Sequence, residues 1–155
     1  MTSIPSSTTN LRARIDTTAR AFLSAFEESD THNDPTIINR DVTPDCHRHL
    51  LPASVPEAFS LPTDFAFDIT TYLQAFTKDL KVLKFKNNVI SNLVIDTETR
   101  RASFISTANI HPINGDSYVG EQAWFLYFNE DGSKVTKVVE FCDKDLLVRM
   151  AKESA

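Results

Sequence analysis

The stretch from Tyr118 to Asp143 constrains the fold of this chain most strongly, because it has the pattern of a single β-hairpin. Residues 118–128 are rich in aromatic side chains and almost free of glycine. The turn-forming sequence NEDGS follows at 129–133, and residues 134–142 return with three valines and a phenylalanine. β-branched and aromatic residues on both sides of a polar, glycine-containing turn are typical of two antiparallel strands.

Pairing Asn129 with Lys134 across this turn sorts the hairpin side chains onto two faces, because successive side chains of a strand point to opposite sides. One predicted face carries Tyr118, Gly120, Gln122, Trp124, Leu126, Phe128, Lys137, Val139 and Phe141. The other carries Val119, Glu121, Ala123, Phe125, Tyr127, Thr136, Val138, Glu140 and Cys142.

Both faces are largely apolar, so each should be covered, and the first also carries a phenol, an amide, an indole and an amine. A covered face of mixed aromatic and polar character is typical of a small-molecule pocket. The residues predicted to bind a substrate there are Tyr118, Gln122, Trp124, Lys137 and Phe141.

Length and charge limit the classes of protein that remain. The chain has 155 residues, of which 41% are hydrophobic, and this fits one domain at residues 11–155 after a flexible polar tail at 1–10. The net charge is -5 and no basic run occurs, so neither nucleic acid nor an anionic membrane is an expected partner. No stretch reaches membrane-spanning length, and we expect a cytoplasmic protein.

Glycine is scarce, and this argues against a nucleotide cofactor. The chain has only Gly115, Gly120 and Gly132, so its sequence contains neither of the common glycine-rich phosphate-binding motifs. The pair His47 and His49 has no further ligands at a recognisable metal-site spacing. The sequence therefore predicts no cofactor and no metal.

Two stretches before the hairpin have the spacing of amphipathic helices. The first lies between Asn10 and Asp30, with apolar positions at Ile15, Ala19, Phe22, Leu23 and Phe26. The second is predicted to start from a cap at Asp64 and to end near Leu80. A short terminal helix at 144–152 should be capped by Asp143.

Strands are predicted at residues 45–52, 89–96 and 102–110, in addition to the two strands of the hairpin. Helices therefore precede a run of strands that have no crossover helices between them. This order predicts an α+β fold with helices packed on one face of a curved antiparallel sheet.

The order of elements and several short motifs resemble the nuclear transport factor 2-like superfamily, in particular its SnoaL-like and ketosteroid-isomerase-like members. The motifs are DCHRHLLPAS at 45–54, and Y-x-x-E-x-x-W, F-x-E-D-G and E-F-x-D between 118 and 143. They are most similar to small fungal enzymes that isomerise or cyclise meroterpenoid and polyketide intermediates. The chain departs from that pattern at two positions: it has Gly120 where the family pattern has Asn, and Gln122 where the family pattern has Tyr. These departures put the usual chemistry of those two positions in doubt.

The resemblance implies a cone-shaped fold in which a curved antiparallel sheet, with helices on its concave face, encloses one apolar cavity. Members of the superfamily are commonly homodimers and commonly work without a cofactor, so the resemblance implies both for this chain as expectations. Some members of the superfamily only bind or scaffold, so the fold alone does not assign an activity.

Isomerisation or cyclisation of a ketone needs a base beside the carbonyl and a donor for the enolate. The densest cluster of suitable groups is His47, Arg48 and His49. On a strand the two histidines share a face and Arg48 takes the other, so one set alone can enter the cavity. The sequence leaves open which set does so, and whether the cluster is instead an exposed strand end.

Glu121 is the fourth catalytic candidate. Under the pairing above, its side chain lies on the other face of the hairpin from that of Trp124. Its simplest role on that face is a contact at a dimer interface. A β-bulge at Gly120 would turn it into the pocket and make it the catalytic carboxylate.

The sequence thus predicts a cofactor-independent isomerase or cyclase that acts by acid–base catalysis on a polycyclic intermediate of fungal secondary metabolism. The alternatives are a dehydratase or hydrolase of the same fold, and a binding or dimerisation module without turnover. A homodimer is expected because the second hairpin face is too apolar to be left in water, at Val119, Ala123, Phe125, Val138 and Cys142.

Overall fold

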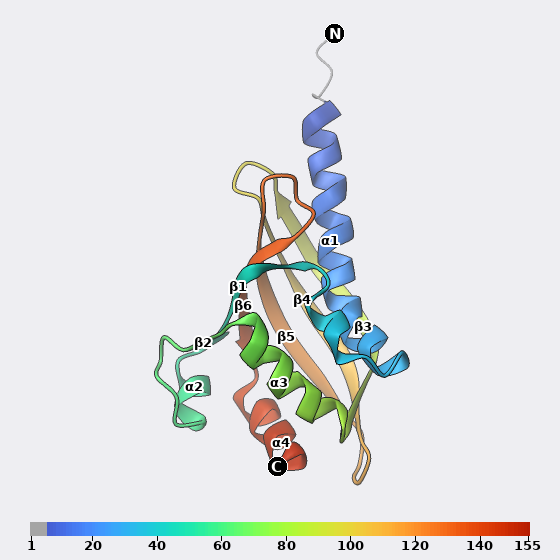
Figure 1. The fold of residues 1–155 in the computed structure, drawn as a ribbon, viewed down its shortest axis with the longest axis vertical. Coiled ribbons are helices and arrows are strands. Elements are labelled where there is room, and N and C mark those ends of the chain that lie inside the picture. The colour runs from blue at the N-terminus through green and yellow to red at the C-terminus, as the bar shows by residue number, and fades with distance from the viewer. Residues whose placement is uncertain (1–5) are drawn as a thin grey trace.

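Six strands form one mixed, curved sheet in the computed structural model, which describes residues 6–155 (Figure 1). Their spatial order is β2-β1-β6-β5-β4-β3. The strands are β1 (Val42–Leu51), β2 (Ala66–Phe67), β3 (Leu83–Asp96), β4 (Arg101–Pro112), β5 (Tyr118–Phe128) and β6 (Val135–Cys142). The bounds of β5 and β6 confirm the predicted hairpin.

Helices cover the concave side of this sheet, so the predicted α+β class is confirmed. They are α1 (Ser6–Thr31), the 3₁₀ helix η1 (Pro35–Asn39), α2 (Ser54–Ala58), α3 (Ile69–Leu80) and α4 (Lys144–Ser154). Among residues 6–155, none of these helices is both long and apolar enough to cross a membrane.

One strand pair departs from the predicted antiparallel sheet. β1 runs parallel to β6, whereas the other neighbours in the sheet are antiparallel. Consecutive strands joined by a short turn must be antiparallel, but β1 and β6 are separated by all the other strands and by α3, which leaves their relative direction free. The expectation of an entirely antiparallel sheet is therefore wrong for this pair.

The long helix α1 packs its apolar stripe against the middle of the sheet. Ile15, Ala19 and Phe22 are almost fully buried and share a core with Phe104 and Trp124 of the sheet. The helix starts at Ser6, within the stretch 1–10 that was predicted as a tail, and residues 1–5 of that stretch lie outside the described part of the chain.

Capping residues set where the last two helices begin. The cap of α3 is Asp68, four residues after the predicted cap Asp64. Asp68 accepts a hydrogen bond from the backbone N–H of Thr71, and the Thr71 hydroxyl accepts one from the backbone N–H of Asp68. The residues just before this cap are held in β2 against β1. α4 begins as predicted, with Asp143 accepting from the backbone N–H groups of Asp145 and Leu146.

A bulge in the hairpin changes which side chains of β6 face inward. At the turn the predicted pairing holds, since the N–H of Asn129 donates to the carbonyl of Lys134 at 3.0 Å. Phe128 pairs with Val135 but Tyr127 pairs with residue 137, so position 136 is an extra residue. From there on the faces of β6 are exchanged relative to the prediction, and the inward set is Val138, Glu140 and Cys142.

Candidate active site

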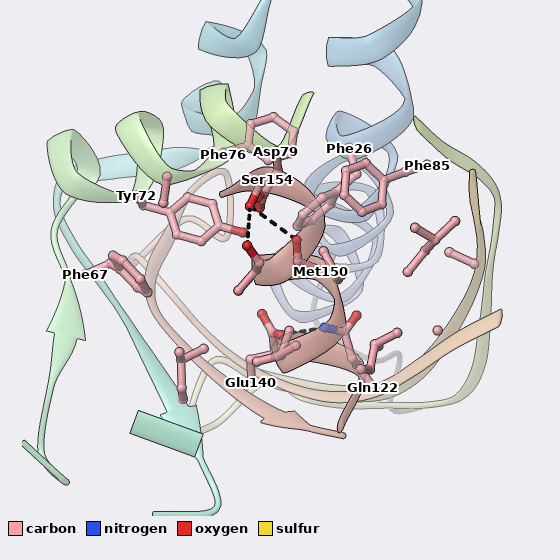
Figure 2. A pocket seen from close by; sticks show the side chains of 18 of the residues that line it. Phe26, Phe67, Tyr72, Phe76, Asp79, Phe85, Gln122, Glu140, Met150 and Ser154 are labelled. Carbon is pink, nitrogen blue, oxygen red and sulfur yellow. Dashed lines mark hydrogen bonds between the residues drawn. The ribbon is translucent and has the colours of Figure 1, made fainter. Parts of the chain in front are cut away.

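One apolar cavity of about 350 Å³ lies between the concave face of the sheet and helices α1, α3 and α4. Figure 2 shows its aromatic walls, which come from Phe26, Phe67, Tyr72, Phe76 and Phe85. Such a volume fits a small organic molecule, and an apolar lining with a few polar groups is the usual composition of a ligand site.

Glu140 of β6 is the most buried carboxyl group in this wall, with a relative exposure of 7%. Its Oε2 accepts a hydrogen bond from the amide Nε2 of Gln122 at 2.5 Å and one from the thiol of Cys142 at 3.1 Å. Burial raises the pKa of Glu140 above its ordinary value, although both hydrogen bonds and the charge of Arg48 act to lower it. Glu140 is therefore a carboxyl group held in an apolar site by two neutral donors.

Arg48 is the member of the His47–His49 cluster that points inward. It is only 4% exposed, and its Nη2 donates to the carbonyl of Ile38 at 3.0 Å. Its guanidinium lies 3.8 Å from the ring centroid of Tyr72, directly behind that cavity wall. Leu50, two residues along β1, pairs with Glu140, so Arg48 and Glu140 lie on the same face of neighbouring strands.

The two histidines lie on the opposite face of β1. His47 is exposed, and His49 is half-buried, with a pKa lowered by burial and by the charges of Lys137 and His47. The structure does not bring either imidazole into the cavity. Within residues 6–155, no three His, Cys, Asp or Glu side chains gather as metal ligands would.

Glu121, Lys137 and Phe141 also lie on the outer face of the sheet. The β4–β5 pairing runs without interruption past Gly120, so no bulge turns the exposed Glu121 inward. The predicted pocket positions of Lys137 and Phe141 are wrong because of the bulge in β6. Lys137 lies with its Nζ 5.0 Å from the ring centroid of Tyr127, and Phe141 is 49% exposed.

The remaining three predicted binding residues lie on the inner face. Gln122 and Trp124 line the cavity, and the indole N–H of Trp124 donates to the hydroxyl of Ser106 at 2.8 Å. Tyr118 packs beside the cavity instead, where its hydroxyl donates to Glu153 at 2.7 Å and its ring contacts the guanidinium of Arg149. Tyr118 thus fastens α4 to the sheet.

Two cavity carboxyls were not among the predicted site residues. The bulge that moves Glu140 inward has no signal in the local sequence. Asp79 did have a signal in the sequence, because it follows Tyr72 and Phe76 at helical spacing and so falls within the apolar stripe of α3.

Gly120 shapes the same wall by having no side chain. A Cβ at this position would lie 2.9 Å from the Cδ1 of Ile110 and 3.1 Å from the Cδ2 of Leu146, and all three residues line the cavity. A larger residue here would therefore occupy part of the space that a ligand can use.

Comparison with solved structures places this fold among known proteins. The chain is similar to the BvnE pinacolase of Penicillium brevicompactum, with 22% identity over 93% of this chain and 96% of that one and a TM-score of 0.76. PrhC of Penicillium brasilianum follows with 17% identity, coverage of 92% and 89% and a TM-score of 0.74. AusH of Aspergillus nidulans has 18% identity, coverage of 85% for both chains and a TM-score of 0.65.

Sequence comparison alone gives no assignment, since no family model and no curated protein sequence matches the chain. The structural neighbours also include a bacterial nuclear transport factor 2-like protein, with a TM-score of 0.62. These neighbours confirm, at the level of the fold, the resemblance found in the sequence motifs. The chain therefore has the nuclear transport factor 2-like fold, which it shares with the three fungal proteins.

Proposed function

We propose that this protein is a cofactor-independent isomerase or cyclase that moves protons on a polycyclic ketone of fungal secondary metabolism. The observation that carries the proposal is the position of Glu140, a buried carboxyl group in the wall of an apolar cavity. Burying a carboxyl group in an apolar site costs stability, so its presence is best explained by chemistry.

Glu140 is the proton carrier in this mechanism. Its carboxylate takes a proton from a carbon next to the ketone, and the electron pair of the broken C–H bond becomes part of an enolate. The same carboxylic acid then returns a proton to this or another carbon. Burial raises the pKa of Glu140 and so makes its carboxylate a stronger base than an exposed one.

Tyr72 is the proposed donor to the enolate oxygen. Its hydroxyl points toward the interior of the cavity (Figure 2). Burial raises the pKa of Tyr72, so the hydroxyl keeps its proton at neutral pH. Arg48 lies against the ring of Tyr72 and supplies a positive charge near the negative charge that develops in the cavity.

The composition of the cavity and the structural neighbours support an enzyme over a binding module. A module that only stores an apolar ligand has no need of carboxyl groups, and this cavity has Glu140 and Asp79 in its wall. One similar structure is a fungal pinacolase, and another, from Xanthomonas campestris, is described as a polyketide cyclase. Both descriptions fit chemistry on small cyclic molecules.

The proposal is tested with β-tetralone, a bicyclic ketone with acidic C–H groups next to its carbonyl. The protein in D₂O, with excess chelator and no nucleotide, should accelerate the loss of these protons in the NMR spectrum over buffer alone. β-Naphthol, a planar mimic of the enol, should inhibit competitively. A rate equal to that of buffer contradicts the proposal, and activity that a divalent metal alone restores contradicts its cofactor independence.

We further propose that a second copy of this chain covers the outer face of the sheet. Apolar side chains are exposed there on β4, β5 and β6, at Ile105 (38%), Val119 (61%), Phe125 (45%) and Phe141 (49%). Sedimentation velocity should show a dimer at micromolar concentration, and Phe125→Glu should shift it toward monomer because it places a charge in the interface. A wild-type monomer throughout that range contradicts this proposal.

A further inference from the structure

Polar side chains stand at two separate places in the wall of the cavity. Glu140 and Gln122 project from the sheet, whereas Asp79 of α3 and Ser154 of α4 lie together at another place. Figure 2 shows the two pairs apart, with aromatic side chains forming much of the wall around them. The mechanism proposed above uses the sheet pair and leaves Asp79 without a role.

Asp79 occupies a position where the helix itself favours an apolar residue. It continues the stripe formed by Tyr72 and Phe76, and all three side chains line the cavity. A residue that breaks the local pattern of its element at the wall of a cavity is typical of a functional position.

The groups around Asp79 leave it a desolvated carboxyl group. Those that interact with it are Lys78 and Tyr72 of α3, Ser154 of α4 and Tyr118 of β5, whose hydroxyl is bound to Glu153. Burial raises the pKa of Asp79, whereas the hydrogen bond from the Ser154 hydroxyl and the charge of the exposed Lys78 lower it. The effect of burial is the larger, so the pKa of Asp79 is raised to about 6. Asp79 is therefore largely ionised at neutral pH and has unused capacity to accept hydrogen bonds.

We propose that Asp79 anchors a hydroxyl group of the substrate at the end of the cavity away from Glu140. This inference rests on the proposed function in that the cavity is taken as the substrate site. An anchor at Asp79 limits the class of substrate to elongated, largely apolar ring systems with a ketone near Glu140 and a hydroxyl group at the far end. The ionised carboxylate accepts the hydrogen bond of that hydroxyl, which fixes which carbon faces Glu140.

Two aromatic probes that differ by one hydroxyl group test the anchor. Naphthalene-2,6-diol has hydroxyls at both ends, and β-naphthol has one. We expect the diol to bind about tenfold more tightly at about pH 7.5, which is the usual contribution of a hydrogen bond to a charged acceptor. The ratio of the two dissociation constants should fall at about pH 5, because Asp79 is then protonated and accepts a weaker bond.

Variants separate Asp79 from the rest of the cavity. Asp79→Asn keeps the shape but loses the charge, so the ratio should fall to about threefold or less at both pH values. Glu121→Gln should keep the ratio of the wild type, because Glu121 is exposed on the outer face of the sheet and does not line the cavity. A folded Asp79→Asn protein that keeps the tenfold preference and its pH dependence overturns the proposal.

The two proposals fail independently in these experiments. If the wild type prefers the diol but does not exchange the protons of β-tetralone, the anchor stands and the proposed catalysis is wrong. If exchange occurs and the wild type binds both probes equally, Asp79 is not an anchor and the catalytic proposal stands.

Discussion

Glu140→Gln is expected to lower the rate of β-tetralone exchange by about a hundredfold or more, the usual effect of losing a positioned general base. Glutamine has nearly the same shape and keeps a hydrogen bond with Gln122, but it cannot take a proton. Because the substitution also removes a desolvated carboxyl group, the protein should fold and melt at the same temperature as the wild type or above it.

The matched control is Glu121→Gln on the neighbouring strand. This residue is exposed on the outer face, so its loss should leave the exchange rate within about twofold of the wild type, as is usual for surface positions. If Glu140→Gln folds and retains more than half of the activity while Glu121→Gln does not, the assignment of the two faces to catalysis and to the exterior is wrong.

Trp124→Ala is expected to lower the free energy of unfolding by about 3–5 kcal/mol, the usual loss for a large aromatic residue in a core. The indole is 2% exposed, and its ring centroid lies 5.5 Å from that of Phe22 and 6.4 Å from that of Phe104. The substitution therefore leaves a cavity between α1 and the sheet that these neighbours cannot fill.

Urea denaturation of Trp124→Ala and Trp124→Phe separates the contribution of packing from that of the hydrogen bond. Trp124→Phe keeps a ring but loses the bond to Ser106, so it should cost less, by about 1 kcal/mol for the bond and a further amount for the smaller ring. A Trp124→Ala protein destabilised by less than about 1 kcal/mol contradicts the burial on which this expectation rests.

Most of the elements could be predicted because their signals are local. The hairpin follows from strands on both sides of a glycine-containing turn, and the stripe of α1 follows from the spacing of Ile15, Ala19 and Phe22. Asp143 caps α4 as predicted, since a short polar side chain before a helix has a simple local function.

The inner face of β6 could not be predicted, because it depends on one extra residue. The predicted pairing is correct at Phe128 and Val135 and then shifts at residue 136, after which every side chain changes face. The prediction consequently placed Lys137 in the pocket and Glu140 outside it. The parallel pairing of β1 with β6 was also missed, because the local sequence of a strand does not show which distant strand it will pair with.

The candidate site was predicted in part for the same reason. Gln122 and Trp124 lie on β5, which has no bulge between them, so their positions followed from alternation. Alternation along β1 separates Arg48 from the two histidines but does not show which of the two faces is the inner one. The register of β1 with β6 shows that Arg48 lies on the inner face. Asp79 could have been found from its place in the apolar stripe of α3.

Titration of the Glu140 carboxyl group by NMR is the most direct test of the central claim. In protein with ¹³C in the glutamate side-chain carboxyls, the Glu140 resonance is assigned by its absence from Glu140→Gln. We expect a titration midpoint above the ordinary value of 4.5 and a change in this resonance when β-naphthol binds. A midpoint at or below 4.5, together with a Glu140 resonance that β-naphthol leaves unchanged at saturation, would show that Glu140 is not the desolvated proton carrier of a ligand cavity.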